Sequence, residues 1–439
     1  MNPDVDVAVV GAGLSGLALA HRLRAEGRSV RVFESSEHVG GRAYTDRRDG
    51  YVIDTGLEML GTHGYPATWR LLRDLGLSDV DAPVIGAPVS VWREGRAHQD
   101  VGDLRGLLTG AGLSVSARMS LLRLAAHVGP RARAFDTDEP ERTPLGATTI
   151  AEFARDYHRE LHDYLLQPLA GGFFGWDTEQ ALAGPLLSHM LAVRASNTFR
   201  TYQGGMDLLV RALSDGVEVS TGVSVQSVDG SRLITDSGEI TARTTVLCVP
   251  APVAARLHPD APAYVHACEY RPMIKVCCLL DRPLTPTGAG SSFAVLVPAV
   301  ENPELSGFIL DDRKHPGRVP PGRGMVTLVA ARGIADDHID APESDVVRVL
   351  MGHAERYLPG LASACTATVV SRFRHGMPVP TARALALRPE FIARPLGPVD
   401  YAGDWYTMRP SSEGAVRSAE IVAERVLAAT RAPLAVPGG

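Results

Sequence analysis

The spacing of apolar residues predicts a strand, a helix and a second strand at the start of the chain. Residues 5–10 carry valine at four of six positions, a β-branched run typical of a buried parallel strand. Leu17, Ala20 and Leu23 then recur with helical spacing, and Gly27 ends that pattern. A second apolar strand is predicted at residues 30–33, so the chain opens with two parallel strands joined by a helix.

The rest of the chain divides into three patterns. A helix from Leu208, strands near 217–223, 225–228 and 246–250, a strand at 399–402 and an amphipathic helix at 413–427 all suit a return to the first sheet. Residues 61–199 are mainly helical in pattern. Residues 261–395 predict strands around Lys275, Phe293, Phe308 and Val326, a helix near Ser344 and a strand ending at Phe373. We therefore predict an α/β fold with an inserted α+β part.

The composition is that of a globular protein of two or three compact units. The 439 residues are 45% hydrophobic and 21% charged with a net charge of -6, which excludes a disordered chain and disfavours a basic nucleic-acid binder. No apolar run is long enough to span a bilayer, and the acidic start at Met1 to Asp4 is unlike a secretory signal. We expect a cytoplasmic protein.

Two residue types are unusual in number or placement. The five cysteines have no paired metal-ligand spacing, so we predict neither a disulfide framework nor a metal site. Only Lys275 and Lys314 are lysines among the 44 cationic residues, and the other 42 are arginines. Coding bias explains that excess, but it makes each lysine an exception whose position needs a reason.

The turn after the first strand carries three glycines with the spacing of a dinucleotide-binding loop. In Gly11-Ala12-Gly13-Leu14-Ser15-Gly16, the first glycine permits a tight turn, the second lets the backbone approach a pyrophosphate, and the third lets helix and strand pack closely. Glu34 follows the second strand, where it can accept hydrogen bonds from a ribose 2′-hydroxyl. The alternative is a glycine turn in an ordinary α/β unit. Similar glycines at 110–112 and 288–290 lack the third position, so we predict loops there and no second dinucleotide such as NADPH.

Two further motifs suit the surroundings of a dinucleotide. Gly40 and Gly41 would let backbone amides pass beside the pyrophosphate, and Arg42 offers a charge-assisted bond to phosphate, although such a run alone is also a common surface turn. Near the far end, Gly403-Asp404-Trp405 predicts a turn, and Glu413-Gly414-Ala415-Val416 predicts the start of a helix whose N-terminus favours negative charge.

Taken in order, these motifs resemble those of the flavin-containing amine oxidase, protoporphyrinogen oxidase and carotenoid desaturase superfamily. The resemblance implies noncovalent FAD, bound by a Rossmann-type domain of residues 1–60, 200–260 and 396–431. An inserted α+β substrate domain of mixed sheet and helices would take residues 61–199 and 261–395, and 432–439 would form a flexible tail.

The resemblance also implies which residues contact FAD. Asp404 would bond the ribityl or pyrophosphate oxygens, Val223 would present a backbone contact to the adenine, and the backbone of residues 414–416 would face the pyrimidine edge of the flavin. The complete predicted set is Gly11, Gly13, Leu14, Ser15, Gly16, Glu34, Gly40, Gly41, Arg42, Gly56, Leu57, Val223, Gly403, Asp404, Gly414, Ala415 and Val416.

Lys275 and Glu58 are the candidate catalytic residues. Lys275 lies in an apolar strand, and in the amine oxidases a lysine in a similar strand hydrogen-bonds a water beside flavin N5; the alternative is a strand-end lysine that reaches solvent. Glu58 follows the stretch that would pass the isoalloxazine, where a desolvated carboxylate could act as a base or orient a substrate N–H; the alternative is a paired structural acid. Lys314, within a polar run, is interpreted as a solvated loop charge.

The substrate is less sharply indicated. Trp176 and His375 are candidates to line the cavity, although ordinary packing is the favoured interpretation of both. Ser411 and Ser412 lie where monoamine oxidases place a tyrosine, which favours a larger substrate over a small primary amine.

The leading hypothesis is an FAD-dependent oxidoreductase that takes hydride from a C–H bond α to the nitrogen of an amine or amide. The product would be an imine or iminium, and the setting bacterial secondary metabolism. One alternative is C–C desaturation of an isoprenoid or tetrapyrrole-like substrate, and another is a flavin-binding module without enzymatic activity. The expected partners are a small organic substrate and oxygen or another electron acceptor, with no nucleic acid; a homodimer is left open.

Overall fold

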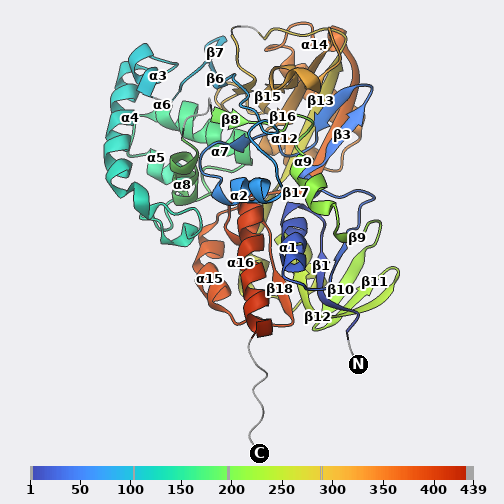
Figure 1. Cartoon of the computed structure of the whole chain (residues 1–439). Helices are drawn as coiled ribbons and strands as arrows, with labels where there is room; N and C mark the ends of the chain where they lie inside the picture. The colour runs from blue at the N-terminus through green and yellow to red at the C-terminus, as the bar shows by residue number, and fades with distance from the viewer. Residues whose placement is uncertain (1–2, 102–103, 195–197, 287, 289, 432–439) are drawn as a thin grey trace, which may run out of the picture.

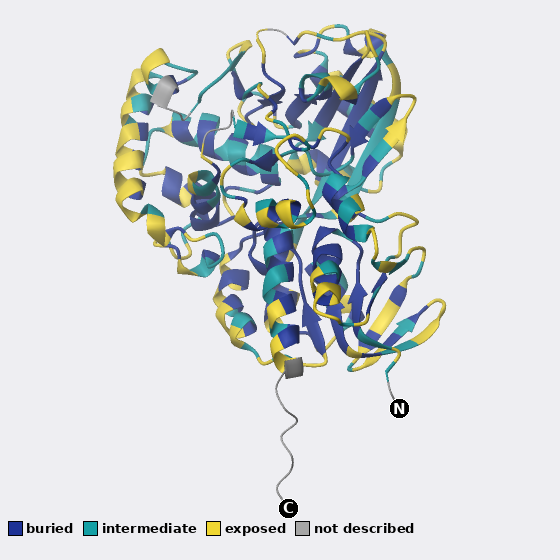
Figure 2. Cartoon of the chain, in the orientation of Figure 1, coloured by how far each residue is buried: buried dark blue, intermediate teal, exposed yellow. Residues whose placement is uncertain are grey.

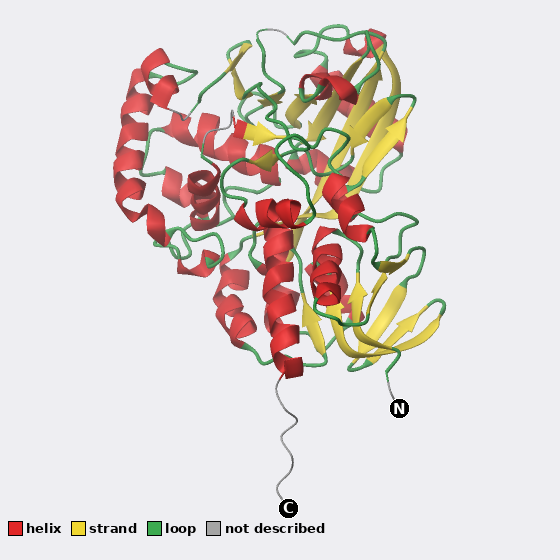
Figure 3. Cartoon of the chain, viewed as in Figure 1, coloured by secondary structure: helices red, strands yellow, loops and turns green. Residues whose placement is uncertain are grey.

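The computed structural model describes residues 3–101, 104–194, 198–286, 288 and 290–431, so the predicted tail at 432–439 lies outside the described residues. Figure 1 shows a lower part built from the first and last elements, an upper part around a second sheet, and a group of helices beside both. Figure 3 shows the same division, with strands concentrated in the lower and upper parts and helices at one side.

The lower sheet has the parallel order that the first motif predicts. Strand β1 pairs in parallel with β2 and β12, β2 with β9, and β12 with β18, while the hairpin of β10 and β11 continues the sheet in antiparallel fashion. Its seven strands are β1 (Val5–Val10), β2 (Val30–Phe33), β9 (Glu218–Ser220), β10 (Val225–Asp229), β11 (Arg232–Thr235), β12 (Gly238–Leu247) and β18 (Val399–Tyr401).

Two long helices from opposite ends of the sequence pack together on the lower sheet. The first follows β1 directly, and the last follows β18, with the hydroxyls of Ser15 and Ser418 only 3.1 Å apart between them. Figure 2 shows buried residues along both helices. The helices of this part are α1 (Leu14–Ala25), α9 (Leu208–Ser214), α10 (Ala251–Leu257), α11 (Ala263–Ala267), α15 (Ala382–Ala393) and α16 (Ser412–Arg431).

The upper sheet is mixed and has its own buried face. Its order is β17-β13-β16-β15-β14-β6-β7, antiparallel throughout except for the parallel pair of β14 and β6. The strands are β6 (Val89–Arg93), β7 (Arg96–His98), β13 (Glu269–Leu280), β14 (Ala294–Leu296), β15 (Leu305–Leu310), β16 (Gly324–Ala330) and β17 (Cys365–Val379). Three helices accompany it, α12 (Arg332–His338), α13 (Glu343–Ala354) and α14 (Leu361–Ala364).

The helical group covers most of the segment for which the pattern predicts helices. It contains α2 (Pro66–Asp74), α3 (Leu104–Thr109), α4 (Val115–Val128), α5 (Ile150–Ala154), α6 (Arg159–Leu161), α7 (Gln167–Phe174) and α8 (Ala183–Val193). The short strands β6 and β7 are the exception, because strands of so few residues leave too little alternation to be separated from a helical pattern. Two small ladders complete the fold, β3 (Thr45–Arg48) with β4 (Tyr51–Asp54) and β5 (Leu60–Gly61) with β8 (Phe199–Arg200).

The lower sheet draws its strands from the three segments that the sequence assigns to a Rossmann-type domain. One hydrophobic cluster nevertheless runs from Val9 in the lower sheet to Ala294 in the upper one, so the two parts share a core. The proposed domain boundaries therefore stay a prediction. None of the helices within the described ranges combines the length and apolar character that a membrane crossing needs.

Candidate active site

The glycine loop between β1 and α1 has the shape of a dinucleotide-binding loop. Gly11 has a φ of +102°, and a Cβ there would lie 2.7 Å from the Cys248 carbonyl oxygen. A Cβ at Gly16 would lie 2.0 Å from the Gly11 carbonyl oxygen, so that glycine is needed for packing. A Cβ at Gly13 would meet no atom within 4 Å, which leaves open space in front of the N-terminus of α1.

The second glycine motif lies directly beside the first. The Gly40 N–H donates to the Ala12 carbonyl at 2.8 Å, and Gly40 forms a β-bridge with Gly13. The Arg42 carbonyl then accepts from the Leu57 N–H at 2.7 Å. Three separate stretches of the predicted cofactor set are thus held together by backbone hydrogen bonds.

The predicted adenosine end is organised around Glu34. Its carboxylate accepts from the backbone N–H groups of Ala12 at 2.8 Å and Ser36 at 2.9 Å, which fixes it beside the glycine loop. The Val223 N–H donates to the Glu34 carbonyl at 2.9 Å. A contact from Val223 to adenine would therefore have to use the Val223 carbonyl.

The two predicted phosphate and ribityl ligands pair with each other. The Arg42 guanidinium donates to both oxygens of Asp404, at 2.8 and 2.9 Å, and also to the Gly376 carbonyl at 2.6 Å. The bidentate pair ties the second motif to the turn that leads into α16. Gly414 lies in the first turn of α16, and Val416 is buried there.

Tyr270 was not identified from the sequence, because a lone tyrosine at the edge of a strand gives no signal. Its hydroxyl is buried without a hydrogen-bond partner among the described residues. Burial, and next the Asp404 carboxylate, raises the pKa of Tyr270 well above its usual value, so the phenol is neutral. It is a neutral polar group beside the paired Arg42 and Asp404.

The residues present fit FAD. An open glycine loop, a helix N-terminus, an acid at the end of β2 and a second helix N-terminus at α16 all belong to the same lower part of the molecule. These are the features that hold a dinucleotide pyrophosphate, a ribose and an electron-rich flavin edge.

Both candidate catalytic residues belong to one buried charge cluster, which we call the lysine cluster: Lys275, Lys314, Glu58, Asp54, Asp311 and Arg318. Lys275, on β13, ion-pairs with one oxygen of Glu58 and donates to the carbonyl oxygens of Asp54 at 3.0 Å and Gly56 at 3.4 Å. It does not reach solvent, since it is only 3% exposed. Burial, and then the Lys314 ammonium, lowers the pKa of Lys275 to about 8.

The interpretation of Lys314 as a solvated loop charge is wrong. Lys314 is 2% exposed and ion-pairs with the second oxygen of Glu58, with Asp311 at 2.9 Å and with Asp54 at 3.2 Å. Its polar neighbours in the sequence suggested solvent, but Asp311–Arg313 form a short helical turn in which Asp311 is buried and pairs with Lys314. Both lysines of the chain therefore meet at Glu58.

Asp54 connects the lysine cluster to the lower part of the molecule. It accepts from Arg318 at 2.7 Å and from the Met206 N–H at 2.8 Å. Burial alone would raise the pKa of Asp54, but the Lys314 and Arg318 charges outweigh it and hold that pKa below its usual value. Asp54 was not singled out from the sequence, because its partners lie far away along the chain.

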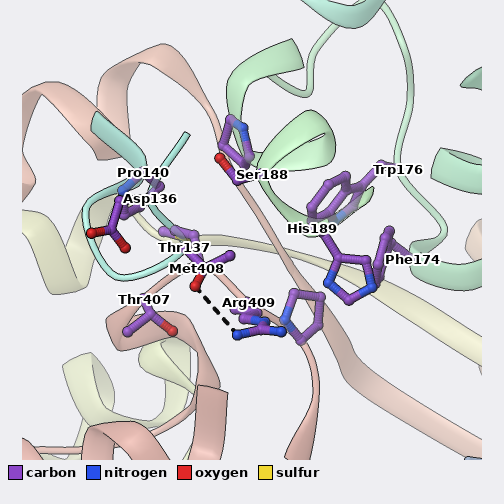
Figure 4. Close-up of a pocket in the computed structure, with 12 residues that line it drawn as sticks. Asp136, Thr137, Pro140, Phe174, Trp176, Ser188, His189, Thr407, Met408 and Arg409 are labelled. Carbon is purple, nitrogen blue, oxygen red and sulfur yellow. Dashed lines mark hydrogen bonds between the residues drawn. The ribbon is translucent and has the colours of Figure 1, made fainter. Parts of the chain in front are cut away.

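The contacts that we describe for the two candidate substrate-lining residues are not with residues of the lysine cluster. Trp176 is buried, donates from its indole nitrogen to the Pro378 carbonyl at 2.9 Å, and stacks on Phe174 beside a pocket (Figure 4). His375 packs edge-on against Tyr270, with ring centroids 5.8 Å apart. Contact of either residue with substrate stays a prediction.

The comparisons with known proteins agree with this geometry. The family model for flavin containing amine oxidoreductase matches residues 14–427. Coproporphyrinogen III oxidase of Propionibacterium freudenreichii subsp. freudenreichii is 27% identical over 442 aligned positions, which cover 85% of this chain and 81% of that protein.

Solved structures share the fold over nearly the whole chain. Putrescine oxidase bound to putrescine superimposes with a TM-score of 0.78 at 20% identity, covering 97% of this chain and 99% of the other. Cyclohexylamine oxidase from Brevibacterium oxydans IH-35A gives 0.73 at 16% identity, covering 98% and 100%. The chain belongs to the flavin-containing amine oxidoreductase family, and it is an FAD-dependent oxidoreductase.

Proposed function

We propose that the protein oxidises an amine or amide at the carbon α to nitrogen, so that the substrate loses a hydride and becomes an imine or iminium. Noncovalent FAD and a biosynthetic setting are part of this proposal. When bound, FAD supplies the electron acceptor. The observation that carries the proposal is the buried Lys275, whose ammonium contacts Gly56 and Glu58, on either side of the Leu57 that donates to the Arg42 carbonyl.

Lys275 is the proposed catalytic residue, and its role is to hold a positive charge and a proton at that position. Its three N–H groups are engaged by Asp54, Gly56 and Glu58. The bond to the Gly56 carbonyl, at 3.4 Å, is longer than the bond to the Asp54 carbonyl at 3.0 Å. It is therefore the weaker of the two, and a water or substrate atom would displace it first.

Glu58 is proposed as a positioning residue rather than as a base. Each of its oxygens is bonded by an ammonium, one from Lys275 and one from Lys314. Contacts of this kind stabilise the ionised carboxylate, which makes it a weak proton acceptor. Of the two interpretations left open by the sequence, the contacts support the paired structural acid.

The choice between substrates rests on two sets of relatives. The structural neighbours named for putrescine and cyclohexylamine support an amine substrate. The broad sequence match to a coproporphyrinogen III oxidase favours, as second candidate, removal of hydrogen from a tetrapyrrole-like substrate.

The test follows the visible absorption of the flavin. The purified protein is expected to show a flavin spectrum, and anaerobic addition of its amine substrate should bleach it. The panel should contain putrescine, cyclohexylamine, larger secondary amines and coproporphyrinogen III. Bleaching by coproporphyrinogen alone would replace the amine proposal by the second candidate. A protein that releases no FAD on denaturation would contradict both.

A further inference from the structure

Helix α4 has a second apolar face, and that face points to solvent. The buried face of the helix packs in the helical group through Ala117, Leu121, Leu124 and Val128. On the opposite side, Val115, Met119 and Leu122 follow one another at intervals of four and three residues, so they share one face. Their side chains are 66%, 62% and 46% exposed, although these residue types are most often buried. The core of the helical group does not use them.

The exposed apolar surface continues at the end of α3. Leu108 is 87% exposed there, and the carbonyl of the preceding Leu107 accepts a hydrogen bond from Arg118 of α4 at 2.9 Å. We call the four exposed residues the α4 stripe: Leu108, Val115, Met119 and Leu122. Within the described ranges, eight large apolar side chains are exposed, and the stripe holds four of them. Apolar side chains that gather on a surface in this way mark an interaction site.

The surroundings of the α4 stripe are basic. Residues 104–135 contain five arginines and no aspartate or glutamate, in a chain whose net charge is -6. Because successive helical residues are turned by about 100°, Arg118 and Arg123 lie on the two sides of the stripe. Arg131 and Arg133 follow the end of α4, and both are exposed. The apolar residues of α4 therefore lie between cations.

The acids of the neighbouring elements do not cancel this charge. Three acids of α5, α6 and the turn after α6 have partners of their own, the Thr149 N–H for Glu152, Arg93 for Glu160 and Arg159 for Asp163. Asp136 and Asp156 are exposed at the margin of the basic surface, and Asp156 adjoins Tyr157, whose ring centroid lies 5.7 Å from the Arg123 guanidinium. Two marginal acids against four arginines leave the surface positive.

Helix α4 lies at the outer edge of the molecule. Figure 1 shows it along the margin of the helical group, and Figure 2 shows exposed residues along its length. A broad surface can therefore approach the stripe from that side.

An anionic lipid bilayer fits both properties of this face. The boundary of its acyl chains takes up the apolar side chains of an interfacial helix, and its phosphate groups attract the arginines beside them. A second copy of this chain fits less well, because an isologous contact through this face would bring two sets of arginines together. With 14 residues, α4 is too short to span a bilayer, so it would lie on the surface.

We propose that α4 and the end of α3 dock the enzyme on an anionic phospholipid surface. The α4 stripe enters the boundary of the acyl chains, and the four arginines beside it contact lipid phosphates. The docking face contains none of the residues assigned to FAD or to the lysine cluster, so the proposal does not rest on the proposed amine oxidation.

The test is flotation of the flavin-containing protein with phospholipid vesicles. We expect binding to vesicles of phosphatidylglycerol and phosphatidylcholine in equal parts, and about tenfold or more weaker binding to phosphatidylcholine alone. Added salt should weaken the binding to the mixed vesicles, because it screens the arginines.

Two double variants separate the apolar and the charged contributions. Met119→Gln with Leu122→Gln should lower the vesicle partition coefficient about tenfold or more, because two apolar side chains no longer enter the bilayer. Arg131→Gln with Arg133→Gln should lower it by a similar factor on the mixed vesicles, at about fivefold for each charge lost.

The matched control is Val300→Gln, which removes an exposed valine outside the stripe and should bind as the wild type does. All the substituted positions are exposed, so each variant should keep the FAD content and unfolding temperature of the wild type. Absence of binding to the mixed vesicles, or equal binding by the Met119→Gln and Leu122→Gln double variant, would overturn the proposal. Sedimentation without vesicles tests the second copy: a wild-type dimer that this double variant splits into monomers would assign the stripe to self-association instead.

Discussion

The glycine loop and the lysine cluster are built in opposite ways. The loop uses backbone shape: short contiguous motifs place Gly13 and Gly40 side by side, and the Gly40 N–H bonds the Ala12 carbonyl. The lysine cluster uses side-chain charge: Asp54, Lys275 and Lys314 come from distant segments and are held by mutual compensation. The glycine loop should therefore be sensitive to added side-chain volume, and the lysine cluster to a change in its charge balance.

Adding one methyl group should be enough to break the glycine loop. Gly16→Ala would place a Cβ 2.0 Å from the Gly11 carbonyl oxygen, so we expect no folded, flavin-containing protein. Gly13→Ala is the matched control, because its Cβ would meet no protein atom within 4 Å. It should keep the unfolding temperature of the apoprotein but lose FAD affinity about tenfold or more, since the methyl enters the space for the pyrophosphate. Fluorescence titration of FAD checks both; wild-type affinity in either variant would contradict the assignment.

Neutralising one acid without changing its size should be enough to break the lysine cluster. Asp54→Asn leaves Arg318 and Lys314 short of negative charge inside the protein, and we expect a loss of about 3–5 kcal/mol in the free energy of unfolding. Asp281→Asn removes a surface partner of Arg282 and should change it by about 0.5 kcal/mol or less. Urea unfolding measures both. A similar small loss in the two variants would mean that charge balance does not hold the cluster together.

The pH dependence of stability should reveal Lys275 separately. Its pKa is about 8 in the folded protein and 10.5 when unperturbed, so the unfolded chain binds more protons between these values. Stability must then rise with pH across that window. Relative to Lys275→Met, the wild type should gain up to about 3 kcal/mol between pH 8 and 10.5. A pH-independent difference between the two proteins in urea unfolding would rule out the lowered pKa.

The contrast between the glycine loop and the lysine cluster also explains which features could be predicted from the sequence. Strand β2 begins and ends at the predicted residues, and α16 extends the predicted helix by a few residues at its end, because periodicity and glycine spacing are local properties. The loop around Gly13 could also be predicted from the sequence, because the residues that form it are consecutive.

The lysine cluster could be predicted only in part. Lys275 stood out as a cation in an apolar strand, but Lys314 looked exposed because its burial depends on acids brought in by folding. The rarity of lysine was the one available signal, and it applied equally to both residues.

The most direct test of the central claim is the rate at which oxygen reoxidises the reduced holoenzyme. If Lys275 holds charge and a proton beside the flavin, Lys275→Met should slow reoxidation about tenfold or more while anaerobic reduction by substrate changes less. Arg282→Met, at an exposed site just beyond the end of β13, should leave both rates unchanged. Equal reoxidation rates in Lys275→Met and the wild type, with equal FAD content, would contradict the role assigned to the lysine cluster.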